Sequence, residues 1–318
     1  MSTSIQPSVG GNFFFVADRD ILKELLADKR SESTRRAYQS DLKDFFLTIC
    51  HHEPSPQLIR EFLCLERFTA IALVLQYKAH LIDKKLAEAT VNRRLAAIKS
   101  LVTFAQKIGK CVWSLEEVTG EKIQSYRDTS GVSGDVYRLI LETCDRASLK
   151  GKRDYAILRL LWDNALRRNE VSMTDVSDFD PLAKTLMILG KGRGTQKEAV
   201  TLSDRSIEAI QDWLVELARP DIKALFVALD RAHFGHRLTG NGIYNLVSDA
   251  AKKAGVHKQF SPHRCRHSSI TAALDATDGN VREVQKLSRH RKIETLLVYD
   301  QQRENVQGKM TNLLSDLV

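Results

Sequence analysis

The sequence lacks the features that mark membrane-anchored or secreted proteins. Its longest apolar run, residues 68–77, is well short of the ~18 consecutive residues that a membrane span needs. Residues 1–11 are polar and lack the basic flank and apolar core of a secretory signal. The five cysteines are widely spaced and odd in number, which argues against a disulfide framework. We therefore expect a cytoplasmic protein in a reducing compartment that does not interact with a membrane.

Motifs for common cofactors are also missing. The sequence has no G-x-G-x-x-G fingerprint, and the glycine-rich stretch at residues 190–194 lacks the spacing of a P-loop. His263 and His267 stand four residues apart like a zinc pair, but the glutamate of H-E-x-x-H is absent and two arginines intervene. We predict a protein that needs neither a cofactor nor a metal.

The composition is that of a folded protein with a mild excess of positive charge. The chain has 318 residues, of which 43% are hydrophobic and 28% charged, so global disorder is excluded and two domains are expected. The net charge is +8, which suits a polyanionic partner without proving one. Residues 93–110 carry five basic side chains and no acidic one, a pattern that more often means a solvated helix face.

Hydrophobic periodicity predicts a small helical domain at residues 17–110, after a loose tail at residues 1–16. Its helices are expected at residues 18–27, 33–49, 70–81 and 91–108. Residues 111–131 lose this periodicity and end in a stretch rich in glycine and serine, so they are predicted to form a linker.

The second domain, residues 132–318, is predicted to combine helices with a small antiparallel sheet. Short strands are expected at residues 175–179, 185–189 and 198–202. Helices are expected at residues 136–147, 153–165, 204–218, 240–253, 262–274, 280–287, 293–301 and 306–317. The fold class is therefore mainly α with a small antiparallel β-sheet.

Residues that could carry chemistry lie in this second domain. Arg167 precedes Glu170 by three residues, which alone would be read as a surface ion pair. Lys191 stands in the glycine-rich turn between two strands. His263 and Arg266 share one face of a helix that starts at Pro262. A lone tyrosine is usually structural, so each of these features is weak when taken singly.

The order of these residues is more informative than any one of them. An arginine, a turn lysine, a His-x-x-Arg pair, His290 and then Tyr299 nine residues later form the pattern of the tyrosine recombinase family. The chain resembles phage integrases and, in size and layout, the bacterial Xer recombinases. The resemblance implies a SAM-like helical core-binding domain followed by a catalytic domain.

The family motifs fall on named positions of this chain. The first arginine of Gly-Leu-Arg-x-x-Glu matches Arg167, and the sheet-turn lysine matches Lys191. His-x-x-Arg matches His263 and Arg266, the histidine of Leu-Gly-His matches His290, and the nucleophile matches Tyr299.

Three positions depart from the family pattern. Ala165 and Arg289 replace glycines, with Ser288 before Arg289, and Arg168 adds a charge where an apolar residue is usual. A large residue at a glycine position requires an altered backbone or makes an extra phosphate contact.

The resemblance implies phosphoryl transfer without a metal. Tyr299 would attack the DNA backbone to give a 3′-phosphotyrosyl link, while Arg167 and Arg266 hold the non-bridging oxygens. Lys191 would protonate the leaving 5′-oxygen. His263 and His290 would donate hydrogen bonds to the phosphate, and Glu170 would orient Arg167 or His263.

The resemblance also implies the partners. These are double-stranded DNA with a specific recombination site and a tetramer on that DNA, formed by copies of this chain or with a related recombinase. Basic residues of the first domain would then follow the phosphates. These candidate DNA-binding residues are Arg35, Arg36, Arg93, Arg94 and Lys99.

Three questions stay open at this level. The apolar C-terminal segment, with Leu313, Leu314 and Leu317, would pack on its own domain or dock on a neighbouring protomer, and we favour the neighbour.

A type IB topoisomerase-like relaxase uses a similar residue set, and a DNA-binding protein that has lost catalysis is a further alternative. Chromosome dimer resolution, element integration and transposon resolution all use this layout, and the short N-terminal region favours an Xer-like system.

Overall fold

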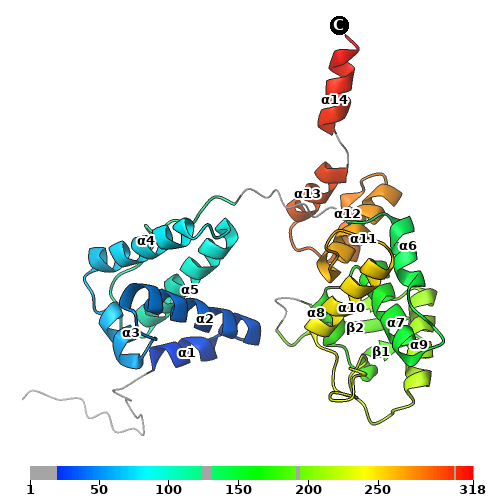
Figure 1. Ribbon diagram of the computed structural model, residues 1–318, viewed down its shortest axis with the longest axis horizontal. Helices are drawn as coiled ribbons and strands as arrows, with labels where there is room; N and C mark the ends of the chain where they lie inside the picture. Colours follow the sequence, from blue (N-terminus) through cyan, green and yellow to red (C-terminus); the bar gives the residue numbers. More distant parts are fainter. Residues whose placement is uncertain (1–19, 124–130, 191–193, 304–305, 318) are drawn as a thin grey trace, which may run out of the picture. The chain divides into compact units, whose positions relative to one another are not determined.

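The computed structural model describes residues 20–123, 131–190, 194–303 and 306–317. The chain forms two compact units, residues 1–126 and 127–318. Helices α1–α5 belong to the first unit, and the sheet with helices α6–α14 belongs to the second (Figure 1). Among the described residues, no helix is both long enough and apolar enough to cross a membrane.

The first unit is a bundle of five helices around one apolar core. The helices are α1 (Ile21–Asp28), α2 (Glu32–Cys50), α3 (Pro56–Leu63), α4 (Arg67–Asp83) and α5 (Glu88–Lys107). Helix α3 was not predicted from the sequence because it is only eight residues long, about two turns, which gives too little periodicity to recognise. Phe45 is central to the core, with edge-to-face contacts to Phe46, Phe62 and Tyr77.

The predicted linker begins inside the first unit. Cys111, Trp113, Leu115 and Val118 are buried in its core, and the Trp113 indole donates a hydrogen bond to the Leu65 carbonyl at 2.9 Å. The first part of this segment, residues 111–118, therefore packs in the core of the first unit. The sequence predicts a linker at residues 111–131 because an extended segment buries single side chains without helical or strand periodicity.

The second unit is mostly helical, as expected. Its helices are α6 (Gly134–Glu142), α7 (Leu149–Asp163), α8 (Arg168–Ser172), α9 (Asp204–Leu217), α10 (Gly240–Lys253), α11 (Pro262–Ala276), α12 (Val281–Ser288), α13 (Glu294–Arg303) and α14 (Val306–Ser315). Helix α6 ends earlier than predicted, and the short α8 was not predicted. The core contains the fully buried Trp213 on α9 and Leu160 on α7.

A three-stranded antiparallel sheet, in the order β1–β2–β3, lies in the second unit. The strands are β1 (Phe179–Asp180), β2 (Thr185–Leu189) and β3 (Lys197–Thr201). The strand predicted at residues 175–179 was wrong, because Val176–Asp178 is a 3-10 turn and only Phe179 and Asp180 pair with β2. Leu189 pairs with Lys197 at the end of the β2–β3 hairpin.

Candidate active site

The first arginine of the motif stands where helix α7 turns into helix α8. The backbone reverses at Ala165, whose φ of +46° lies in the left-handed region, a conformation that costs a non-glycine residue roughly 1–2 kcal/mol. Arg167 precedes the first turn of α8 and contacts Glu170 twice. Its backbone N–H donates to Glu170 Oε2 at 2.8 Å and its Nη1 donates to Oε1 at 2.7 Å.

Arg266 lies at the centre of the site. Helix α11 starts at Pro262, with Ser261 accepting the Arg264 N–H as a cap, and this start places Arg266 in the second turn. Its side chain is 2% exposed and donates hydrogen bonds to the carbonyl oxygens of Ala165 and Ser288. Arg266 thus joins the turn after α7 to the end of α12.

Arg289 and His290 follow the end of helix α12. Arg289 has a φ of +56°, so the position that holds glycine in the family motif needs a left-handed residue here as well. The Arg289 side chain points back into the site and donates to Glu170 Oε2 at 2.9 Å. His290 lies next to Arg266, with 3.4 Å between Nε2 and the Arg266 Nη2.

Tyr299 lies on helix α13 against the same group of residues. Its ring centroid is 4.3 Å from that of His267 and 6.0 Å from that of His290. The side chain is 8% exposed and belongs to a small apolar cluster that includes Ala165 and Leu296. Burial raises the pKa of the Tyr299 hydroxyl, and the positive charges of Arg266 and Arg167 partly offset this rise.

The pKa values of the site reflect several positive charges close together. Burial, with Arg167 and Arg289 nearby, lowers the pKa of Arg266 to about 10. Burial and the same guanidinium groups lower the pKa of His290 to about 4, so its ring is neutral at pH 7. Burial acts to raise the pKa of Glu170, but Arg289 and Arg167 hold it below its usual range. Positive charge is therefore in excess where Tyr299 lies.

The structure brings together four of the six residues that the sequence predicted to be catalytic, namely Arg167, Arg266, His290 and Tyr299. His263 is exposed at the start of α11 and is near enough to contribute to the lowered pKa of His290. Lys191 lies outside the described residues, between the ends of β2 and β3.

Two residues of the site were missed. His267 follows the His-x-x-Arg motif directly, and its adjacency to Arg266 was the available signal. Arg289 was noted only as a departure from the family pattern. Its contacts could not be foreseen, because they depend on how three helix ends meet.

The candidate DNA-binding arginines of helix α5 are engaged by carboxylates. Arg93 bonds to the buried Asp41, and Arg94 bonds to Asp44. Arg94 is the less accessible of the two, with a side chain 21% exposed against 46% for Arg93. The Tyr77 hydroxyl also donates to Asp44, at 2.5 Å.

The remaining candidates in the first unit are more accessible, with the exception of Lys99. Arg35 is exposed and its Nε donates to the Lys29 carbonyl at 2.6 Å. Arg36 forms an exposed ion pair with Glu32 at 2.6 Å, its side chain 73% exposed. Lys99 is half-buried on α5.

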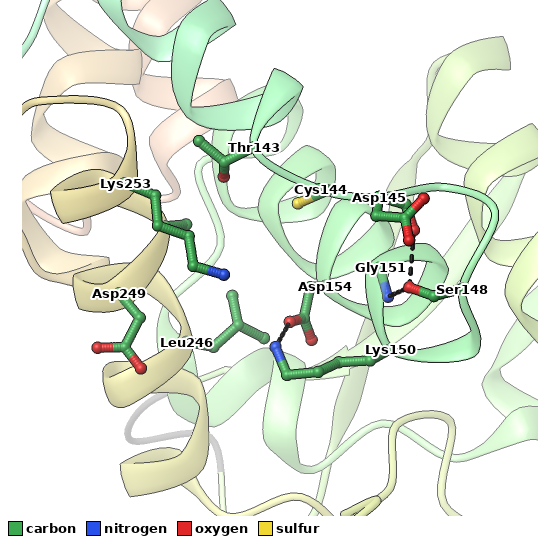
Figure 2. A pocket seen from close by; sticks show the side chains of 11 residues that line it. Thr143, Cys144, Asp145, Ser148, Lys150, Gly151, Asp154, Leu246, Asp249 and Lys253 are labelled. Carbon is green, nitrogen blue, oxygen red and sulfur yellow. Dashed lines mark hydrogen bonds and ion pairs between the residues drawn. The ribbon is translucent and has the colours of Figure 1, made fainter.

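A separate hollow of about 120 Å³ lies between the α6–α7 connection and α10 (Figure 2). Its charged lining is mixed, since it includes Lys150 and Lys253 as well as Asp145, Asp154 and Asp249, and Lys150 pairs with Asp154 at 2.5 Å. The hollow therefore lacks the positive excess that distinguishes the site around Tyr299. Within the described ranges, no cluster of histidine, cysteine or acidic side chains has the arrangement of a metal site.

Known families match both units of the chain. The phage integrase family matches residues 132–305, and the phage integrase N-terminal SAM-like domain matches residues 21–109. The chain belongs to the phage integrase family and is a tyrosine recombinase.

Individual relatives agree with this assignment. Tyrosine recombinase slr0733 of Synechocystis sp. is 54% identical over 302 residues, which cover 95% of this chain and 96% of that protein. Tyrosine recombinase XerC of Corynebacterium glutamicum is 29% identical, covering 85% of this chain and 82% of that protein. Among solved structures, the XerH site-specific recombinase in a post-cleavage complex with palindromic difH substrate shares the fold, with a TM-score of 0.68 at 18% identity, covering 92% of this chain and 84% of that one.

Proposed function

We propose that this recombinase cleaves and rejoins duplex DNA at a specific site through a 3′-phosphotyrosyl intermediate. The observation that carries the proposal is the convergence of Tyr299, Arg167, Arg266 and His290 in one site where positive charge is in excess. A phosphodiester is the anion of DNA that such a site would bind, and a tyrosine beside it is a nucleophile for phosphorus.

In the proposed reaction the Tyr299 oxygen attacks the phosphorus, and the 5′-oxygen leaves with a proton. The phosphodiester bond is exchanged for a phosphotyrosyl bond, so the reverse attack by a 5′-hydroxyl rejoins DNA without ATP. Arg167 and Arg266 bind the non-bridging oxygens, because a guanidinium stays charged at neutral pH and donates two parallel hydrogen bonds. This stabilises the charge that builds up in the transition state.

The histidines and the lysine complete this scheme. His290 Nε2 faces an arginine, which has only donors, so the proton of the neutral ring belongs on Nδ1. Nδ1 is buried and finds no hydrogen-bond partner among the described residues, so it would donate to a phosphate oxygen once DNA binding makes it accessible. His263, which is exposed at the start of α11, would donate a second hydrogen bond to the phosphate. Lys191 as the acid for the 5′-oxygen rests on the family motif alone.

The first unit would contact the DNA outside the site of cleavage. Arg35 and Arg36 are exposed, so they are free to exchange their present partners for phosphates. Arg93, Arg94 and Lys99 are weaker candidates, because Arg93 and Arg94 are already paired with carboxylates and Lys99 is half-buried.

Exchange of strands between two duplexes needs four nucleophiles, so we propose a tetramer on DNA, formed by this chain or with a related recombinase. A tetramer bound to a Holliday junction is known for lambda integrase. Leu313, Leu314 and Leu317 on the C-terminal segment are 53%, 62% and 72% exposed, which supports docking of this segment on a neighbouring protomer. Deletion from residue 305 onward should then impair assembly on DNA more than folding. The reverse result would favour packing on its own domain.

A suicide-substrate assay tests the chemistry. Nicked duplexes from a random pool are mixed with the protein without metal or ATP, denatured and separated on a gel. We expect a covalent protein–DNA adduct that disappears in Tyr299→Phe, and sequencing of the trapped DNA gives the site. An adduct that survives in Tyr299→Phe would assign the nucleophile to another residue.

This assay and a plasmid relaxation assay together separate the alternatives. A type IB topoisomerase-like relaxase would relax plasmids that lack any target site, whereas a site-specific recombinase would not. A catalytically silent DNA-binding protein would bind DNA in a salt-sensitive way and give no adduct with any duplex. For a recombinase active in an Xer-like role, such as chromosome dimer resolution or element integration, the trapped sequences should converge on one site.

A further inference from the structure

Two guanidinium groups connect the same pair of turns in this protein. Arg266 donates to the carbonyl oxygens of Ala165 and Ser288. Arg289 donates, through one nitrogen, to the carbonyl oxygens of Asn164 at 3.1 Å and Leu287 at 2.9 Å. The turn after α7 and the end of α12 are therefore bridged twice, at adjacent residues of each segment.

The second bridge exists only because an arginine occupies a left-handed position. Arg289 has a φ of +56°, where glycine would be free of steric strain. A glycine there would supply the backbone conformation and neither of the two carbonyl contacts. The side chain is 12% exposed, so it is held inside the protein and does not extend into solvent.

Arg289 also connects the two turns to Arg167. Its second terminal nitrogen donates to Glu170 Oε2 at 2.9 Å, and Glu170 accepts the backbone N–H and the Nη1 of Arg167. The carboxylate is 1% exposed, so its orientation is set by these partners. Glu198 on β3 forms a second ion pair with Arg289, at 3.7 Å from its Nε.

We propose that Arg289 is a positioning residue of the active site, which fixes Glu170, and through it Arg167, while holding in register the turns that carry Arg167 and His290. It acts through these residues, because its terminal nitrogens donate to Glu170 and to the carbonyl oxygens of Asn164 and Leu287. The catalytic part of this inference rests on the proposed function, and its structural part does not.

The test compares Arg289→Gly with Arg289→Lys and with Asp278→Gly. Glycine at 289 relieves the positive φ and removes the guanidinium together. Asp278 is an exposed residue with a φ of +49°, so Asp278→Gly gives the same backbone relief without removing a contact of the site. Lysine at 289 keeps the charge toward Glu170 but has no planar fork for both the carboxylate and the carbonyls.

The first readout is the rate of adduct formation on a suicide substrate at saturating protein, with DNA affinity measured separately. We expect Arg289→Gly to lower the rate by about 10–100-fold, as loss of a supporting partner does in other sites, with DNA affinity changed by less than about 3-fold. Arg289→Lys should fall between Arg289→Gly and the wild type, and methylguanidinium should restore part of the rate in Arg289→Gly. A rate equal to that of Asp278→Gly and the wild type would overturn the proposal.

The second readout does not need catalysis. The Arg167 amide is bonded to Glu170, so its hydrogen exchange reports directly on the position of that carboxylate. We expect faster exchange at Arg167 and at residues 288–290 in Arg289→Gly and no change there in Asp278→Gly. Unchanged exchange would refute the positioning role. If the wild type forms no adduct while exchange changes as expected, the proposed function fails and the positioning of Arg167 by Arg289 stands.

Discussion

Arginines of helix α5 and arginines of the candidate active site differ in how their charges are balanced. In the first unit Arg93 and Arg94 each have a carboxylate of their own, Arg93 with Asp41 and Arg94 with Asp44. In the second unit Arg167 and Arg289 share the single carboxylate of Glu170.

Arg266 is more deeply buried than Arg167 and Arg289. It bonds to carbonyl oxygens and a histidine, not to a carboxylate. Uncompensated buried charge is costly, so a protein keeps it where an anionic substrate will complete the balance. The number of basic residues in a segment does not show whether its arginines are balanced by carboxylates. The partners of each guanidinium group in the structure do show this.

Replacement of Arg266 by lysine should have the largest effect. Loss of one preorganised donor to a transition-state charge lowers a rate by about 100–1000-fold, and lysine cannot reproduce the two carbonyl contacts of Arg266. We expect a fall of that order in adduct formation, whereas Arg94→Lys in the first unit should leave the rate unchanged. The measurement is single-turnover cleavage of a suicide substrate, and similar rates for the two variants would contradict the comparison.

Removal of the shared carboxylate should destabilise the protein more than removal of an individual one. Glu170→Gln leaves the guanidinium groups of Arg289 and Arg167 without the buried carboxylate that they share, and breaking a buried pair costs about 3–5 kcal/mol. Asp44 is 34% exposed, so Asp44→Asn should cost only about 1 kcal/mol. Urea unfolding of the two variants gives both values, and equal losses would show that sharing the carboxylate has no energetic consequence.

The pH dependence of stability should reveal the neutral histidine. His290 has a pKa of about 4 in the folded protein against an ordinary value of 6.5, so the unfolded chain binds a proton that the folded protein does not. Its contribution to stability is therefore full above about pH 6.5 and is lost as the pH falls toward about 4. In His290→Asn the free energy of unfolding should fall less over this interval.

The exposed His257, replaced by asparagine, is the matched control for this measurement. Urea unfolding at several pH values between about 7 and about 4 gives the difference between each variant and the wild type. Parallel curves for His290→Asn and the wild type would show that the pKa of His290 is the same in the folded protein and the unfolded chain.

The smallest effect concerns the exposed arginines of the first unit. Arg36→Ala should weaken DNA binding a few-fold and reduce the salt slope by about 1, because one phosphate contact is lost. Its stability should change by less than about 0.5 kcal/mol, since the pair with Glu32 is exposed. Arg94→Ala should do the reverse, lowering stability with little change in the salt slope. A flat salt dependence of the wild type would refute the basic-face hypothesis altogether.

Much of the fold could be predicted from hydrophobic periodicity. Helices such as α2 and α5 are long and amphipathic, so their residues repeat often enough to show a face. Helix α8 has five residues and forms because Glu170 bonds back to Arg167, a contact that periodicity does not show. Trp113 was assigned to a linker because an extended segment that closes a core has no repeating pattern.

The sequence by itself determined the order and type of the candidate catalytic residues, and with them the family, because the motif spacing survives although two of its glycines are replaced. Only the tertiary structure decided what the two replacing residues do. Ala165 and Arg289 both adopt the left-handed backbone that glycine would supply, and the Arg289 side chain turns inward to Glu170. That outcome depends on where the ends of α7, α8 and α12 meet, which is a property of packing and not of any local stretch of sequence.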